Sequence, residues 1–430
     1  MVDRFINFFT SLRLTVVCLA LALVLVFVGT LAQVQIGLYA AQSEYFRSFF
    51  VYWTPKGTHW KIPFLPGGWL LGLVLLVNLL AAHIKRFHLS RKKIGLNLIH
   101  GGLILLLGGQ FLTEVFQVEG QMRLEPGDVK NYSESGRKNE LAVIDTTDPD
   151  KDRVVAIPES LVAQGGEIRT PELPFTLRVE KYYPNSFPAG PMSGESEKIK
   201  AADGIGRRLL FSPTNIARSM DEVDLPAALV QVVSDKGPIG EWVVSTWYTR
   251  YPAFARLQAD IGGIMPDVKV TSPQTFTFNG RTYEIALRPV RYYNPYSVKL
   301  LAFNHDLYLG TDVPKNFSSK IHLTDPTTGD DRDILIYMNN PLRYHGETFY
   351  QASFEPGDKV SILQVVRNPV SLAPYIACSL VALGLVTQFL MHLFAFARRR
   401  AQQAKPLPPR KAPATPVREP ALANGKGRRL

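Results

Sequence analysis

The chain has long apolar stretches near its two ends and a more polar middle. Four stretches contain no Asp, Glu, Lys or Arg and are mostly apolar, at about 14–34, 67–84, 94–113 and 371–397. A helix needs about 20 apolar residues to cross a bilayer, so we predict four membrane-spanning helices. The first apolar core is longer than that of a signal peptide, and no clean cleavage site follows Thr30, so we expect it to be retained as an anchor.

The segment between the third and fourth apolar stretches has a different pattern. Its apolar residues alternate with polar ones or form short β-branched and aromatic runs, such as FTLRVEKYY at 175–183 and AALVQVV at 227–233. Asn279-Gly280 lies between two such runs and predicts a tight hairpin. We predict an all-β domain, a sandwich or curved double sheet of about ten or more strands. Residues 186–226 are less regular, and we expect them to be an exposed insertion.

Together these patterns predict an integral membrane protein with four transmembrane α-helices and a large all-β domain inserted between the third and fourth. The expected parts are an N-terminal membrane domain (1–116), the β-rich domain (117–367), the fourth transmembrane helix (368–397) and a basic tail (398–430). The tail is rich in Pro, Ala and basic residues and is predicted to be disordered.

The distribution of Lys and Arg predicts the orientation. The link 85–93 holds five basic residues and no acidic one, and the tail 398–430 holds ten basic residues and one acidic one. Basic segments stay on the cytoplasmic side, so both termini are expected inside and the β-domain outside, in a bacterial cytoplasmic membrane. Segment 114–367 has 28 basic and 34 acidic residues. The overall charge of +11 therefore belongs to the cytoplasmic parts, where it favours anionic lipid over nucleic acid.

The two cysteines do not indicate redox chemistry. Cys18 and Cys378 both lie in predicted spans, at different depths, and are not expected to pair. The β-domain has no cysteine and hence no disulfide framework. CxxC and CxxCH motifs are missing from the sequence, which excludes a thiol–disulfide enzyme and a c-type cytochrome.

Three of the eight histidines lie within the predicted spans. His100 follows Lys93 by seven residues, which at about 1.5 Å per residue is roughly 10 Å into the membrane. His392 is at a similar depth from the same face, and Gln388 could hydrogen-bond it, whereas His83 lies at the cytoplasmic boundary. An ionisable residue inside a membrane is a functional candidate, and a neutral imidazole can bind a metal or haem iron. The alternative is packing or snorkelling, which we favour for His83 and His392.

The neighbours of His100 predict a pocket around it. Asn97 is on the same helical face and could orient the ring. Gly101 and Gly108, and likewise Gly102 and Gly109, are seven residues apart and form a stripe of small residues that lets another helix or a flat ligand come close. A pocket lined by imidazole and glycine and open to the cytoplasm suggests that the protein carries something outward.

The β-domain carries little catalytic signal. His305, His322 and His345 are single histidines on or beside predicted strands, and HExxH, GxSxG and P-loop motifs are missing from the sequence. We interpret each as a hydrogen-bonded structural residue. The loop 35–66 is rich in aromatic residues, as expected for an interfacial belt or for a cover over an apolar ligand or partner.

Several stretches resemble the ResB/CcsB family of the System II cytochrome c biogenesis machinery. FTSLRLTVVCLALALVLVFVGTLAQ (9–33) is similar to the first span of that family, and NLIHGGLILLLGGQFLT (97–113) is similar to its third span. NNPLRYHGETFYQASFEPG (339–357), together with the span after it, resembles the end of the external domain and the last span.

The resemblance implies a subunit of a cytochrome c synthetase that moves haem b across the membrane and presents it with apocytochrome c for covalent attachment. It implies three partners: a CcsA/ResC-type membrane protein with a WWD segment, apocytochrome c, and a thiol–disulfide reductase of the pathway. The family's histidine in the third span is an axial haem ligand, and the second ligand comes from the partner. By position this role carries over to His100, with His83 as second choice. No WWD-like stretch occurs in this chain, so an accessory role is implied, and whether it counts as an enzyme is open.

Other classes of protein fit less well. A scaffold or sensor would dock a periplasmic partner through the β-domain without binding haem. A hydrolase or transferase would need a site in the β-domain, against which the missing motifs argue. A transporter would show inverted repeats or broken spans, and the four predicted spans show neither.

Overall fold

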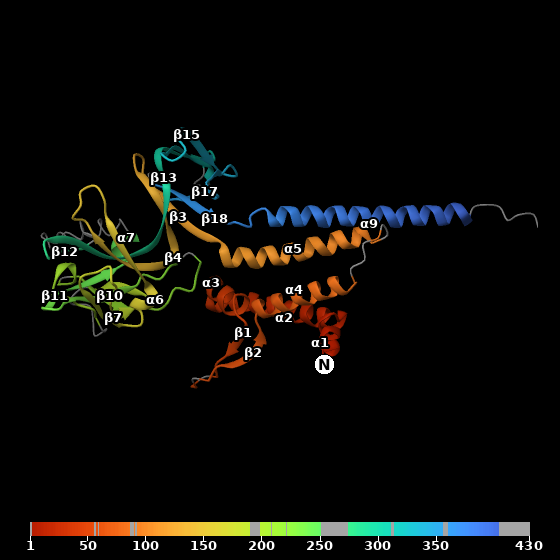
Figure 1. Ribbon diagram of the computed structural model, residues 1–430, viewed down its shortest axis with the longest axis horizontal. Helices are drawn as coiled ribbons and strands as arrows, with labels where there is room; N and C mark the ends of the chain where they lie inside the picture. The colour runs from red at the N-terminus through yellow and green to blue at the C-terminus, as the bar shows by residue number, and fades with distance from the viewer. Residues whose placement is uncertain are drawn as a thin grey trace, which may run out of the picture. The chain divides into compact units, whose positions relative to one another are not determined.

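The computed structural model describes residues 2–55, 57, 58, 60–86, 90, 93–189, 198–207, 209–220, 222–250, 274–310, 314–355 and 360–403 (Figure 1). Within these residues, four helices are long and apolar enough to cross a membrane. They are α2 (Leu12–Ile36), α4 (Gly68–Arg86), α5 (Ile94–Phe116) and α9 (Ala373–Gln403). A large β-rich region lies between α5 and α9 in the sequence, which confirms the predicted fold class.

The contacts within the chain divide it into two compact units. The first contains Met1–Ala82 and Leu107–Leu372, and the second contains His83–Leu106 and Ala373–Leu430. Helix α5 therefore contributes its first half to the second unit and its second half to the first.

In the first unit, a buried asparagine holds α2 and α4 together. Asn78 of α4 accepts a hydrogen bond from Thr15 Oγ1 of α2 at 2.6 Å. Its amide donates to the carbonyl of Phe9 at 2.7 Å, at the end of α1 (Val2–Phe9). A polar side chain among apolar helices is stable only when such partners satisfy it, so Asn78 fixes how these helices approach each other.

The segment between α2 and α4 folds into α3 (Leu38–Ala41), the π-helix η1 (Gln42–Phe46) and the hairpin β1 (Phe50–Trp53) and β2 (Ile62–Pro66). Two glycines let α4 begin directly against this segment. A Cβ on Gly67 would lie 2.2 Å from the carbonyl oxygen of Ser48, and one on Gly68 would lie 2.4 Å from that of Phe46. Several aromatic side chains of the hairpin are exposed, as the belt interpretation expects: Tyr52, Trp53, Trp60 and Phe64.

The described strands of the β-domain form one large sheet and two smaller ones. The large sheet contains β3 (Val118–Leu124), β4 (Val129–Asp145), β5 (Arg153–Pro158), β12 (Gln274–Phe278), β13 (Arg281–Leu307), β14 (Pro314–Asp325), β15 (Asp330–Tyr337), β16 (Leu342–Tyr344), β17 (Glu347–Phe354) and β18 (Ser361–Arg367). The four-stranded sheet contains β6 (Gly166–Ile168), β7 (Thr176–Tyr183), β10 (Ala227–Ser234) and β11 (Gly237–Ser245), and β8 (Ser186–Ala189) pairs with β9 (Leu210–Pro213). Short helical turns α6 (Glu159–Val162), η2 (Gly204–Arg207) and α7 (Trp247–Arg250) interrupt the strands.

The 27-residue strand β13 contributes to two separate hydrophobic cores. Its first part, with Leu287, packs with β4 against the four-stranded sheet in a sandwich. Its second part, with Leu300, packs against β14, β17 and β18. The pairing of β13 with β4 shifts register after Pro289 and again after Tyr293. Such bulges bend a strand, and they lie between the two cores.

The Asn279-Gly280 hairpin is confirmed. Phe278 of β12 pairs with Arg281 of β13, so the loop has two residues, and both have positive φ, 50° and 74°. Asn-Gly suits such a turn because these residues adopt the left-handed region at low cost.

The expectation that 186–226 is an exposed insertion is wrong for part of the segment, although Phe187, Ile216 and Met220 are exposed. Ile199, Ile205 and Phe211 are buried together with Tyr183 of β7 and Val243 of β11. The short β8–β9 pair and η2 bring these side chains against β7, β10 and β11 of the four-stranded sheet. This sparse spacing of apolar residues has neither a strand nor a helix period, which is why the pattern did not reveal it.

In the second unit, α5 and α9 pack side by side through glycines (Figure 1). A Cβ on Gly102 would lie 2.7 Å from Cγ2 of Val381 and 2.8 Å from the carbonyl oxygen of Ala377. Two turns earlier on α5, Gly95 faces Gly384 of α9. A Cβ on either one would lie 2.8–2.9 Å from the carbonyl oxygen of the other. Small residues permit such close backbone approach, so part of the predicted glycine stripe is a helix contact.

Candidate functional site

Two histidines from different helices lie beside each other in the second unit. His83 is on the last turn of α4 and His100 on the second turn of α5. Their ring centroids are 6.0 Å apart, with the ring planes inclined by 48°. Both side chains are half-buried. In the sequence these residues are two separate candidates, and the fold brings them together as a histidine pair.

The backbone orients the His100 ring. Nδ1 lies 3.0 Å from the carbonyl oxygen of Leu96, one turn earlier on α5. A carbonyl oxygen can only accept, so Nδ1 carries the proton and donates it. In the neutral ring this leaves the lone pair on Nε2, and metal-binding histidines are commonly held in this way by a carbonyl on the other nitrogen. His100 is therefore arranged to act as a ligand through Nε2.

The other residues predicted around His100 are placed as follows. The ring of His100 bonds to the Leu96 carbonyl. Within the described contacts, the ring makes no hydrogen bond with the side chain of Asn97. A Cβ added to Gly101 would meet nothing within 4 Å among the described atoms, whereas Gly102 is turned toward α9. The helix surface next to His100 is therefore open on the Gly101 side and closed on the Gly102 side.

His392 has a different environment. The side-chain amide of Gln388 donates to Nε2 of His392 at 2.9 Å, which confirms the hydrogen bond expected from their spacing. The ring is exposed on α9. Because this bond uses the lone pair of the ring nitrogen that accepts it, the structure favours a packing role. His59 and His88 lie outside the described residues.

The histidine pair has the donor chemistry for a haem iron. Haem iron takes axial ligands of this kind. His83 and His100 would be the residues of this chain that hold such a group, and the helix surface at Gly101, next to His100, is open.

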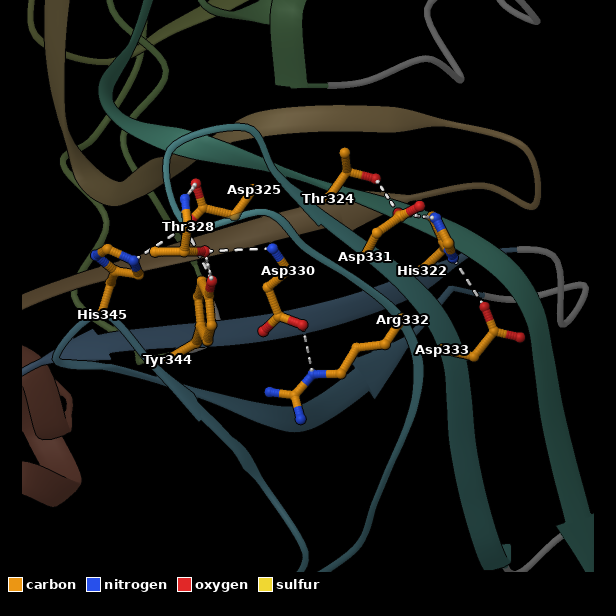
Figure 2. Close-up of polar contacts among 10 residues, drawn as sticks. All are labelled: His322, Thr324, Asp325, Thr328, Asp330, Asp331, Arg332, Asp333, Tyr344 and His345. Atoms are coloured by element: carbon orange, nitrogen blue, oxygen red, sulfur yellow. Dashed lines mark hydrogen bonds and ion pairs between the residues drawn. The ribbon is translucent and has the colours of Figure 1, made fainter.

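A polar cluster in the β-domain is a second feature, which the sequence analysis did not identify (Figure 2). Buried Asp325 accepts hydrogen bonds from the backbone N–H of Thr327 at 2.8 Å and its hydroxyl at 2.5 Å, and from the hydroxyl of Tyr344 at 2.9 Å. Nε2 of His345 lies 3.0 Å from the same carboxylate. The bonds from Thr327, followed by those from Tyr344 and Thr328, hold the pKa of Asp325 far below its usual value.

His345 reaches this carboxylate because of its unusual backbone. It has φ of 46° and is followed by Gly346 with φ of 77°, in the two-residue loop between β16 and β17. The His-Gly dipeptide between two short apolar runs is the sequence signal for this turn. Its distant partner, Asp325, could not be inferred from that signal.

His322 lies between two carboxylates on the surface of β14 and β15 (Figure 2). Nδ1 is 2.8 Å from Asp333 and Nε2 is 2.7 Å from Asp331. The hydrogen bond to Asp333, and then that to Asp331, raises the pKa of His322 above its usual value. His322 and His345 are thus hydrogen-bonded, as expected, and no group of three His, Cys, Asp or Glu that could hold a metal occurs in the described part of the chain.

Comparison with known proteins shows that part of the chain is similar to a known family. A model of the ResB-like family matches residues 269–362. This part of the β-domain is similar to the ResB-like family. The matched residues include the Asp325 cluster, and both His83 and His100 lie outside them.

Protein NrfI of Wolinella succinogenes is 30% identical to this chain over 117 residues. The aligned part is 27% of this chain and 13% of NrfI. The spanning helices are consistent with a membrane protein.

Proposed function

We propose that this chain is a member of the ResB-like family and a haem-binding subunit of a cytochrome c assembly complex. It carries haem b across the bacterial cytoplasmic membrane and presents it, with apocytochrome c, for covalent attachment. The basic link and tail face the cytoplasm, and the β-domain faces outward. The protein works with a CcsA/ResC-type membrane partner and a thiol–disulfide reductase, which keeps the apocytochrome thiols reduced. Bond formation belongs to the partner, so this chain is an accessory subunit.

The observation that carries the proposal is the histidine pair. Nε2 of His100 keeps its lone pair because Nδ1 donates to Leu96, and the open surface at Gly101 leaves room for a flat ligand beside it. Haem in a membrane needs a dry slot and axial ligands. In this proposal, His100 is one axial ligand and the partner supplies the other, with His83 as the candidate within this chain.

The first test is an absorption spectrum of the complex of this protein with its CcsA/ResC-type partner. Wild type should show Soret and α bands, and His100→Ala should lose them and regain them with added imidazole. His392→Ala is the matched control, because it removes another histidine of a spanning helix whose ring is held by Gln388. Unchanged haem in His100→Ala would overturn the assignment of His100.

A second measurement decides where the other ligand comes from. If the partner supplies it, His83→Ala leaves the spectrum of the complex unchanged, and the chain purified alone binds little haem. If His83 supplies it, the chain alone binds haem with two imidazole ligands, and either single variant converts the iron to a form with one imidazole ligand. The 6.0 Å separation of the rings makes this second outcome a specific alternative.

A scaffold or sensor function is the second candidate, and the location of the family match favours it. Residues 269–362 belong to the β-domain, which makes this domain the part that the family model recognises. A scaffold would dock a periplasmic partner through this domain without haem. It predicts that neither the chain nor the complex carries haem, and that deleting the β-domain abolishes assembly.

A further inference from the structure

A cavity of about 500 Å³ lies in the first unit, apart from the histidine pair. It is formed by the first half of α4, the second half of α5 and the segment around α3 and η1. Its size is within the range of about 300–1,000 Å³ for small-molecule sites. Its lining includes Gly68, the first residue of α4, and Glu114, near the end of α5. The cavity is therefore at the end of the spanning helices that leads into the β-domain.

Most of the wall is apolar. Trp69 packs edge-on against Phe111, with ring centroids 5.5 Å apart, and Leu73 and Leu76 extend this surface along α4 toward the other end of the helix. Such a wall suits a hydrocarbon chain.

The polar groups of the cavity are two carboxamides and one ion pair. Nε of Arg47 lies 2.9 Å from Oε1 of Glu114, and both side chains are partly exposed. Gln42 and Gln110 also line the cavity, and their side chains make no hydrogen bond with any residue in the described ranges. Gln42 begins the π-helix η1, and Arg47 follows its end. Single turns of π-helix are rare and often occur at functional sites.

We propose that this cavity binds a zwitterionic phospholipid, phosphatidylethanolamine being the simplest example. The Arg47 guanidinium has five N–H donors, of which the contact with Glu114 uses one, so the others can bind the phosphate. The second carboxylate oxygen of Glu114 accepts from the ammonium group. The two carboxamides bind the glycerol ester region, and the apolar wall takes an acyl chain.

The charge of the site selects among amphiphiles. Arg47 and Glu114 together are neutral, which complements a headgroup with one positive and one negative charge. An anionic lipid, or haem with its two carboxylates, would place uncompensated negative charge beside Glu114. This proposal does not depend on the haem-carrying function, because neither His83 nor His100 lines the cavity.

Glycine substitutions test occupancy. Gly72 of α4 lines the cavity, and a Cβ there would meet nothing within 4 Å, so Gly72→Leu places a side chain in this space. Gly108→Leu is the matched control, since Gly108 is also an open helical position in a span and does not line the cavity. The readout is native mass spectrometry of the full chain after exchange into mixed phosphatidylethanolamine and phosphatidylglycerol.

Wild type and Gly108→Leu should retain one phosphatidylethanolamine, with about tenfold preference over phosphatidylglycerol, as expected for one charge-assisted contact. Gly72→Leu should lose it, with an unchanged thermal midpoint as evidence of folding. Glu114→Gln should reverse the preference toward phosphatidylglycerol, because Arg47 then stands uncompensated. Free glycerophosphoethanolamine should not compete, which distinguishes a lipid from a headgroup alone.

Three results would overturn the proposal: no retained lipid in wild type, equal retention of both lipids, or retention unaffected by Gly72→Leu. A Gly72→Leu complex that loses haem but keeps its lipid would assign the cavity to haem. The His100→Ala variant should retain its phosphatidylethanolamine. Failure of the haem proposal and failure of the lipid proposal are therefore separate outcomes.

Discussion

Gly101 and Gly102 are adjacent in sequence, and the structure predicts opposite responses to the same substitution. A methyl group on Gly102 would lie 2.7 Å from Cγ2 of Val381 and 2.8 Å from the carbonyl oxygen of Ala377 on α9. Both distances are shorter than the 3.4 Å at which ordinary contact begins. A methyl group on Gly101 would meet no described atom within 4 Å.

The expected magnitude follows from two terms. Replacing glycine by alanine inside a helix stabilises it by about 0.5–1 kcal/mol, and this gain is common to both positions. Overpacking a close contact costs about 1–3 kcal/mol, and this cost applies to Gly102→Ala alone. One of the close atoms is a backbone oxygen, which cannot move without shifting α9. Gly102→Ala should therefore be less stable than Gly101→Ala by about 1–3 kcal/mol.

The assay is thermal unfolding of the purified full chain in one detergent, followed by far-ultraviolet circular dichroism because the spanning helices dominate the helical signal. Wild type and the two variants are compared at one protein and detergent concentration. Gly101→Ala should unfold at or above the wild-type midpoint, and Gly102→Ala below it. If the two variants unfold at the same midpoint, the close approach of α5 and α9 does not contribute to stability.

Three further predictions concern other contacts. Asn78→Ala should destabilise the helices by about 1–2 kcal/mol, seen as a lower thermal midpoint, because it removes the buried partner of Thr15; an unchanged midpoint would contradict this. Arg288→Met should lower the free energy of unfolding by about 3–5 kcal/mol, measured by denaturant titration, because it leaves the carboxylate of Glu140, whose side chain is only 9% exposed, without its ion-pair partner. The double variant Arg288→Met/Glu140→Leu should recover most of this loss. His322→Gln should have a lower thermal midpoint than wild type below pH 6.5, and this difference should vanish at alkaline pH. The reason is that the raised pKa of His322 stabilises the folded state only while the imidazole is protonated. A difference in thermal midpoint that does not change with pH would refute this.

Local sequence patterns were sufficient for the elements themselves. Runs without charged residues determined the four spanning helices, because an unpaired charge is costly in hydrocarbon. Alternation of apolar and polar residues predicted most of the strands, and Asn279-Gly280 predicted its turn, because both depend on residues close together in the chain. The imidazole of His100 was recognisable as a candidate for the same reason, since its position inside an apolar helix is visible in sequence.

Tertiary structure decided which elements meet, because such contacts depend on helix rotation and strand register over long separations. The sequence marked a glycine stripe, but only packing showed that Gly102 faces α9 while Gly101 is open. His83 precedes His100 by 17 positions in the sequence, and only the fold placed the two side by side. Likewise, the carboxylate of Asp325 meets His345 because two strands of the β-domain converge at one turn. Local pattern thus determined the helices, strands and turns of this protein, and long-range packing determined the sites.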